Sequence, residues 1–445
     1  ADPIDADQKL QEDALMSYVA SVNYSYDDKY YASFSFRRDG SSRLSPDTRW
    51  GNFWSLSASW RLSQERFMQP LKSVLSDLKL RASYGVNGNL PSSYYGYQST
   101  YTTGAFYSGK PSPWESTLGN EELTWEKNYA LNLGLDIGLF SRVNVSLDWY
   151  TRTTKDLLMS KQLNSISGFS SLLTNVGQMR NTGVELEVRS NNIKTKDFSW
   201  TTAFNLSHNK NKILKLADLP WFVDGRYVRK EGYPFNTIYL REYAGVGPET
   251  GSALYYDNQQ DENGNYTKNK VTDPGQASPI PLKDITPTIS GGFMNTFNYK
   301  FIDLSFNLSY SFGGYSYDNA SYILQDDGYS VISNKSTEQR RRWQKPGDIT
   351  DVPRFVYGNK KGGNYNSSRA IHSTDHIRLK SLILGLNAPK AWLQKLGIGN
   401  ARIYFSGTNL LTWAAYDQYD PEMSGVVGFY TPPLKTYAFG LELKF

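Results

Sequence analysis

The stretch from Tyr129 to Phe140 reads YALNLGLDIGLF and alternates between apolar residues and small or polar ones. Its odd-numbered positions are all large and apolar, while positions 130–138 carry Ala, Asn, Gly and Asp at the even numbers. Because successive side chains of a β-strand point to opposite faces, this pattern predicts a strand with one apolar and one polar face. The alternation resumes after the short turn Gly138–Arg142 and continues through 143–149. The two runs together predict a long antiparallel hairpin.

The same alternation recurs in other parts of the chain, at 30–37, 54–62, 302–312 and 437–445. The runs last roughly 10–12 residues, close to the length of a tilted membrane-spanning strand and about twice that of a common soluble strand. Their polar faces are rich in Ser, Asn and Gly, and aromatic residues gather at the strand ends, as in membrane girdles. The pattern therefore favours a transmembrane antiparallel β-barrel over a soluble β-sandwich.

The composition fits this fold class and excludes others. The chain has 33 Tyr against 21 Phe and 11 Trp, an excess expected where rings lie between lipid and headgroups. No stretch approaches the roughly 20 apolar residues of a membrane helix. There is no Cys, which excludes disulfides and thiolate metal sites. The net charge of +5 is spread without a basic run and does not indicate nucleic-acid binding.

Loop lengths predict the organisation of the strands. Short turns, expected on the periplasmic side, largely alternate with long connections, and short helical turns are expected near 63–77 and 387–399. We expect a lead-in segment at 1–14 and a portion of the barrel at 15–445, with about 13–15 strands. The first strand, 15–26, and the last both run toward the periplasm, which implies an odd number. Since single-chain bacterial barrels have even numbers, the parity predicts that the first strands are missing.

A series of motifs resembles the SusC/RagA-like TonB-dependent outer-membrane transporters. The motifs occur in the family's order and cover nearly the whole chain. They are FRRDGSSR at 36–43 with RWG at 49–51, LRASYGVNGN at 80–89, WEKN at 125–128, NVG at 175–177, NTGVE at 181–185, SGTNLL at 406–411 and DPE at 420–422. Leu44, where an aromatic residue is expected, and the loose turn Gly385–Pro389 depart from the family pattern.

The resemblance implies a barrel of about 22 strands with a plugged lumen. It also implies an energised TonB complex that displaces the plug, and a SusD-like surface lipoprotein that delivers oligosaccharides or peptides. The family's plug and TonB-contacting segment have no counterpart in this sequence. The resemblance thus predicts an importer of bulky nutrients, and this chain is expected to form the C-terminal part of its barrel wall in the bacterial outer membrane.

An alternative from another class is a surface glycan-binding or adhesion β-protein without transport, and a passive porin is a weaker one. An enzyme is not expected, because the chain lacks the Gly-x-Ser-x-Gly elbow, the phosphate-binding loop and the Rossmann glycine pattern. No catalytic residue and no cofactor is therefore predicted.

Aromatic residues in long loops are the candidates for substrate contact, because rings among polar neighbours suit sugars and peptides. The alternative is that these rings pack against neighbouring loops or the lipoprotein. The candidates are Tyr94, Tyr95, Tyr97 and Trp114 in one loop and Trp221 in another. The C-terminal residues Phe439, Leu441, Leu443 and Phe445 match the strand signal that outer-membrane assembly machinery reads.

Three polar patterns suggest a metal or binding site but favour simpler interpretations. The acidic stretch 257–273 resembles a calcium loop, yet Tyr266 stands where Gly is needed and the final Glu is missing. His372 and His376 lie at a strand start, where their spacing separates them, and no metal site is predicted. The Arg37–Gly40 motif is best explained as a turn with paired charges.

Overall fold

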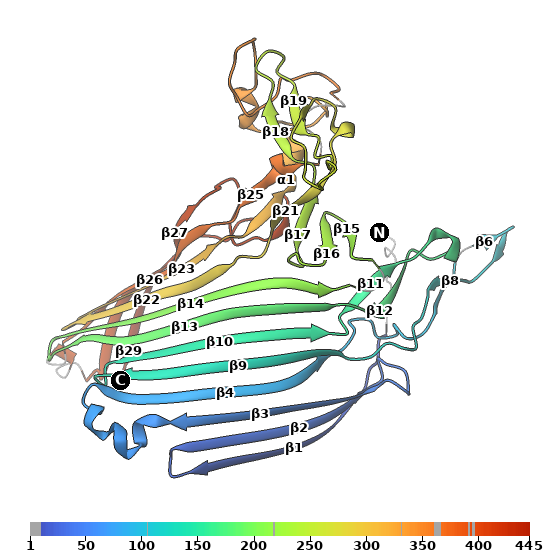
Figure 1. Cartoon of the computed structure of the whole chain (residues 1–445). Coiled ribbons are helices and arrows are strands. Elements are labelled where there is room, and N and C mark those ends of the chain that lie inside the picture. Colours follow the sequence, from blue (N-terminus) through green and yellow to red (C-terminus); the bar gives the residue numbers. More distant parts are fainter. Residues whose placement is uncertain are drawn as a thin grey trace, which may run out of the picture. The chain divides into compact units, whose positions relative to one another are not determined.

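The structure, a computed structural model, describes residues 10–104, 106–216, 219–330, 332–359, 366–389, 392–393 and 397–445. Within these residues, long strands form a 13-stranded sheet in the order β1-β2-β3-β4-β9-β10-β13-β14-β22-β23-β26-β27-β29 (Figure 1). These strands are β1 (Leu15–Tyr26), β2 (Tyr30–Ser41), β3 (Trp50–Arg61), β4 (Leu75–Asn89), β9 (Glu126–Leu139), β10 (Val143–Lys155), β13 (Gln178–Lys194), β14 (Phe198–Lys215), β22 (Ile289–Tyr299), β23 (Ile302–Phe312), β26 (His376–Asn387), β27 (Asn400–Ala414) and β29 (Thr436–Lys444). Each strand neighbours the next long strand of the sequence, as in an up-and-down barrel wall.

The connections carry short strands and single turns of helix. The short strands are β5 (Thr100–Thr102), β6 (Phe106–Tyr107), β7 (Lys110–Pro111), β8 (Trp114–Thr117), β11 (Leu158–Gln162), β12 (Ser171–Asn175), β15 (Trp221–Asp224), β16 (Tyr227–Lys230), β17 (Thr237–Leu240), β18 (Tyr243–Val246), β19 (Ala253–Tyr256), β20 (Lys270–Val271), β21 (Ile280–Asp284), β24 (Tyr315–Asp318), β25 (Ile371–Ser373) and β28 (Gly425–Val427). The helices are α1 (Asn319–Leu324) and the 3-10 turns η1 (Leu62–Gln64), η2 (Arg66–Leu71), η3 (Ser165–Ser167), η4 (Pro274–Gln276), η5 (Thr337–Arg341) and η6 (Ser368–Ala370). Among the described residues, none of the helices has both the length and the apolar character needed to cross a membrane.

The chain divides into two compact units, which are described separately. The first comprises Ala1–Glu185 and Lys210–Pro220, and the second comprises Leu186–Asn209 and Trp221–Phe445. Strands β13 and β14 contribute residues to both units.

In the first unit, large apolar side chains on one face of the sheet are exposed. Phe34 of β2 lies opposite Leu56 of β3, which in turn lies opposite Tyr84 of β4. Their exposed fractions are 45%, 53% and 42%. A continuous apolar row of this kind is unfavourable in water, and it is the arrangement expected where strands face lipid.

The other face of the same strands is polar. Ser33 of β2, Ser57 of β3, Ser83 of β4 and Asn132 of β9 lie opposite one another in succession. They border a hollow of about 390 Å³, and the Asn132 amide donates to the Ser83 hydroxyl at 3.3 Å. The small hydroxyl and amide side chains form a surface that water can wet, as on the inner wall of a barrel.

The second unit has the same two faces. Leu386 of β26, Ile403 of β27 and Leu441 of β29 lie opposite one another, and all three side chains are exposed. On the opposite face, Arg402 pairs with Asp303 of β23 at 2.6 Å. In both units, the apolar rows are thus exposed on one face of the sheet, and polar groups lie on the other face.

The predicted fold class is confirmed, and several predicted boundaries agree with the structure. The strand expected at 15–26 is β1. The hairpin predicted from the opening stretch is β9 paired with β10, with Leu133 opposite Trp149. The helical turn expected near 63–77 corresponds to η1 and η2. Part of the turn expected near 387–399 lies outside the described residues.

Candidate functional site

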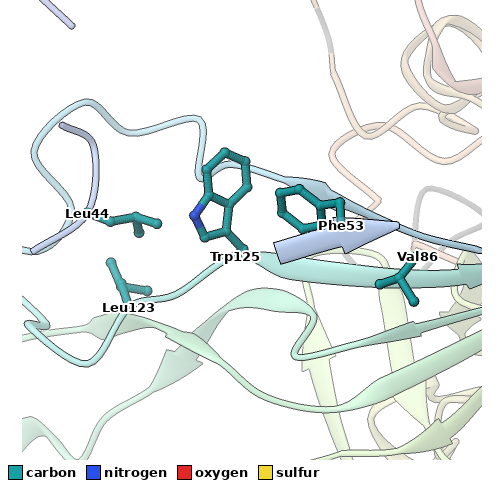
Figure 2. Packing of buried hydrophobic residues seen from close by; sticks show 5 residues of the cluster. All are labelled: Leu44, Phe53, Val86, Leu123 and Trp125. Atoms are coloured by element: carbon teal, nitrogen blue, oxygen red, sulfur yellow. The ribbon is translucent and has the colours of Figure 1, made fainter. Parts of the chain in front are cut away.

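A small hydrophobic core in the first unit holds loop segments against the ends of the strands. Figure 2 shows its five buried side chains, which are Leu44, Phe53, Val86, Leu123 and Trp125. The rings of Phe53 and Trp125 meet edge to face with centroids 5.2 Å apart. The Trp125 indole N–H also donates to the carbonyl of Arg49 at 2.8 Å. Leu44, the departure from the family pattern, is fully buried here.

Two glycines of the motifs make room for this core. A Cβ at Gly51 would lie 2.5 Å from the Phe53 ring, and a Cβ at Gly88 would lie 2.3 Å from it. Such distances are far inside van der Waals contact, so a side chain at either position would displace the ring. The glycine of the RWG motif and Gly88 of the LRASYGVNGN motif therefore leave room for the Phe53 ring, and their role in this core is structural.

The Arg37–Gly40 motif is also used within the fold. Asp39 is buried and accepts a hydrogen bond from the Arg37 guanidinium at 2.6 Å. The Arg38 guanidinium lies over the Trp50 ring, 5.2 Å from its centroid. These contacts satisfy the charged groups inside the chain and favour the structural interpretation over a binding site.

The structure brings two of the predicted loop tyrosines together. The Tyr94 and Tyr95 rings have centroids 6.4 Å apart, and the Arg43 guanidinium lies 4.1 Å from the Tyr94 ring centroid. Tyr97 accepts a hydrogen bond from the Gln98 amide at 3.0 Å. Tyr94 thus serves partly as packing for Arg43, whereas the Tyr95 ring is exposed.

Trp114 lies on a short hairpin of the same loop. It begins β8, opposite Thr102 of β5, and its side chain is 59% exposed. An exposed indole on a loop hairpin is available for contact with a ligand or a partner protein.

Trp221, in the second unit, lies at the edge of a groove. Its ring and the Tyr239 ring have centroids 6.1 Å apart with their planes tilted by 49°. The groove has a volume of about 460 Å³ and is bordered by these rings and by polar side chains. The polar members include Gln259, Gln260 and Ser278, and Tyr266 adds a third ring.

The groove is built by short strands and connecting segments between Trp221 and Pro281. Trp221 belongs to β15 and Tyr239 to β17 of one four-stranded sheet. The Gln259 amide donates to the Ser278 hydroxyl at 3.2 Å, which fixes the amide at the groove's edge. The Tyr239 hydroxyl is neutral and can donate a hydrogen bond, and burial raises its pKa further above the ordinary value. Rings next to amides and hydroxyls suit a polar ligand with flat apolar faces, such as a sugar or a peptide.

Sequence reasoning identified Trp221 but missed its neighbours. Tyr239 lies in a strand of only four residues, and Gln259 and Gln260 fall in a region where no regular pattern was found. The sequence singled out Tyr266 only because it stands where a calcium-binding loop requires Gly. In the structure, β17 pairs with β21 near 280–284, Gln259 donates to Gln276 and Ser278 just before β21, and Gln260 pairs with Tyr266.

The acidic loop is a hydrogen-bonded turn. The Asp261 carboxylate accepts hydrogen bonds from the backbone N–H groups of Asn263 and Asn265 at 2.9 and 2.8 Å. Asp257 accepts from the Thr267 hydroxyl and the Asn269 amide at 2.8 and 2.9 Å. No group of three or more His, Cys, Asp or Glu side chains suited to a metal ion occurs among the residues that the structure describes.

The two histidines serve separate packing roles. His372 of β25 stacks on Tyr416 with ring centroids 3.7 Å apart, and burial lowers its pKa. His376 begins β26 and is buried, with its Nδ1 atom 2.8 Å from the carbonyl oxygen of Thr374.

The C-terminal candidates line one face of the last strand. Phe439 and Leu441 of β29 lie opposite Phe405 and Ile403 of β27. Leu443 and the final Phe445 follow at the same spacing of two, and all four candidates are exposed. They continue the apolar row of the second unit.

Comparisons with known proteins agree with this geometry. A family model described as "TonB dependent receptor-like, beta-barrel" matches residues 4–238. TonB-dependent receptor P3 of Formosa agariphila is 33% identical, over 98% of this chain and 46% of the relative. TonB-dependent receptor SusC of Bacteroides thetaiotaomicron is 31% identical, over 99% of this chain and 45% of the relative.

A solved structure shares the fold as well as the sequence. The RagAB peptide transporter structure has a TM-score of 0.87 and 31% sequence identity, over 97% of this chain and 48% of that one. The chain spans a little under half the length of the relatives that it matches. The two-faced antiparallel sheet, the family model and these relatives agree: the chain belongs to the TonB-dependent receptor β-barrel family, and it is a bacterial outer-membrane protein.

Proposed function

We propose that this chain forms much of the barrel wall of a TonB-dependent importer of bulky nutrients, either oligosaccharides or peptides. In this proposal a SusD-like surface lipoprotein delivers the nutrient, and the TonB complex acts through a part of the protein outside these residues. The observation that carries the proposal is the two-faced sheet, with exposed Leu56 on one side and the polar row of Ser57 on the other. One face suits lipid and the other suits a water-filled passage.

The exposed apolar rows also weigh against the adhesion alternative. A soluble glycan-binding protein of this size would bury such rows between two sheets. We retain the division into a lead-in at 1–14 and a barrel portion at 15–445, which is compatible with the start of β1 at Leu15.

We propose Trp221 as a substrate contact, because its ring borders a polar groove and is partly exposed. Trp221→Ala in the full-length protein is expected to weaken nutrient binding about tenfold, which corresponds to about 1.4 kcal/mol, because tryptophan is enriched among the contacts that carry most of the binding energy. Binding of a panel of fluorescently labelled oligosaccharides and peptides by cells that express the importer measures the effect.

The matched control is Trp392→Ala. Trp392 is also an exposed tryptophan, but it lies in the connection between β26 and β27. This connection is at the same ends of the strands as the short turns between β13 and β14 and between β22 and β23. Its replacement is expected to leave binding unchanged. Equal binding by the Trp221→Ala variant and the unmodified protein would remove Trp221 from the substrate path.

We also propose substrate contacts in the first unit, with less support than for Trp221. They are Tyr94, Tyr95, Tyr97 and Trp114. Tyr95 and Trp114 expose their rings, whereas Tyr94 already packs against Arg43. Within this group we expect Trp114→Ala to have the largest effect on binding in the same assay, because the exposed fraction of its side chain exceeds that of Tyr95.

We further propose that Phe439, Leu441, Leu443 and Phe445 form the assembly signal of the barrel. Phe445→Ala is expected to lower the amount of folded protein in the outer membrane several-fold, with Lys444→Ala as the neighbouring control. Heat-modifiable gel migration of outer-membrane fractions gives the folded amount. If both variants assemble as well as the unmodified protein, these residues are only part of the lipid-facing row.

A further inference from the structure

The connection between β3 and β4 displays apolar side chains that the fold itself does not use. This rim segment, residues 62–74, contains the 3-10 turns η1 and η2. Phe67, Leu71 and Val74 are 64%, 51% and 47% exposed. Phe140, in the turn between β9 and β10, is also exposed and donates its backbone N–H to the Val74 carbonyl at 2.8 Å. Four large apolar side chains are therefore gathered at the ends of these strands.

Glu65 holds the rim segment on the lipid-facing side of the sheet. Its carboxylate accepts hydrogen bonds from the Tyr30 hydroxyl at 2.6 Å and from the Trp60 indole at 3.2 Å. Tyr30 and Trp60 lie opposite each other on β2 and β3, and their spacing of four from Phe34 and Leu56 places both rings on the apolar face.

The start of the segment is held by polar contacts as well. The buried Ser63 hydroxyl donates to Asp77 of β4 at 2.6 Å, and the Arg61 guanidinium pairs with the same carboxylate at 2.9 Å. Polar groups thus fix the backbone, while the side chains of Phe67, Leu71 and Val74 are exposed. Such side chains are costly in water and favourable in an acyl-chain boundary.

We propose that the rim segment is an interfacial anchor in the periplasmic leaflet of the outer membrane. Phe67, Leu71, Val74 and Phe140 enter the acyl boundary, and Arg66 and Lys72 place their cations at the lipid phosphates. The occupant is phospholipid because the segment continues the lipid-facing face through Tyr30 and Trp60, and because cations flank its apolar residues. The anchor fixes the rim of the wall next to β4.

A fluorophore at residue 67 tests the anchor. The chain has no Cys, so Phe67→Cys in the full-length protein, with any Cys outside these residues replaced by Ser, carries a single label such as NBD. The labelled protein is reconstituted in phospholipid vesicles, and heat-modifiable migration confirms its folding. Nitroxide lipids quench a label among acyl chains, and iodide quenches one in water.

Two controls calibrate the measurement. Leu56→Cys lies on the lipid-facing row, and Lys196→Cys lies in the exposed short turn between β13 and β14. The label at residue 67 is expected to be quenched by nitroxide lipids about as strongly as at residue 56, and by iodide several-fold less than at residue 196. Iodide quenching equal to that at residue 196, without lipid quenching, would overturn the anchor and indicate a surface for a periplasmic protein.

The cations give a second readout. In vesicles that contain phosphatidylglycerol, lipid quenching at residue 67 is expected to exceed that in purely zwitterionic vesicles. Arg66→Gln with Lys72→Gln is expected to remove this difference while leaving folding intact, since neither residue is buried. A difference that persists in the double variant contradicts the assignment of the two cations to lipid phosphates.

Discussion

Leu56→Arg is expected to remove most of the folded protein from the outer membrane, whereas Ser57→Arg, one residue along, is expected to assemble. Leu56 lies in the middle of β3, on the apolar row, and is 53% exposed. An arginine facing lipid at the bilayer midplane costs about 2–4 kcal/mol. Ser57 lies on the polar face, at the hollow that the serine row borders, where a charged side chain remains in water.

Quantitative heat-modifiable electrophoresis of outer-membrane fractions compares the two variants. The pair is matched because the same residue is introduced on the same strand, so only the face differs. Equal assembly of both variants, or failure of Ser57→Arg alone, would show that the faces are assigned wrongly.

Trp125→Ala is expected to lower the free energy of unfolding of the barrel wall by about 3–5 kcal/mol, since it truncates a large buried side chain. The substitution removes the edge-to-face contact with Phe53 and the hydrogen bond to the Arg49 carbonyl. It leaves a cavity among Leu44, Phe53 and Leu123 (Figure 2). The loop segments that this core holds should loosen first.

The temperature at which the folded gel band disappears measures this loss. Trp114→Ala is the control, because its exposed indole contributes little to packing and its removal should change stability by less than about 0.5 kcal/mol. A Trp125→Ala barrel that is as heat-resistant as the Trp114→Ala barrel would mean that the core does not hold the loops.

The long strands were predictable because their signal is local. Each alternation, such as that of Tyr129–Phe140, reports the two environments of a single strand, and short turns such as Gly138–Arg142 fix the pairing of neighbours. The estimate of 13–15 strands therefore agrees with the 13-stranded sheet of the described residues. The short strands of the long connections have only two to five residues, too few for an alternation to stand out, so they left no comparable pattern.

The candidate site was predictable only in part. Trp221 was recognised as an aromatic residue in a long loop, but its groove depends on Tyr239 and on Gln259, which only tertiary pairing brings near it. The family resemblance identified the motifs that contain Gly51 and Gly88, but the sequence does not show why glycine is required at the two positions. Gly51 and Gly88 come from different strands and meet at one ring, that of Phe53, a convergence that spacing along the chain does not reveal.

The most direct test is a spin-label scan of β9. Single Cys variants at each position of 129–139 carry a nitroxide in the reconstituted full-length protein, and collisions with oxygen, which concentrates in lipid, are compared with those of a water-soluble nickel complex. Oxygen should dominate at Leu131, Leu133 and Leu135, and the nickel complex at Asn132 and Asp136, with a period of two. Labels at the leucines that neither reagent reaches, as between two packed sheets, would contradict the account.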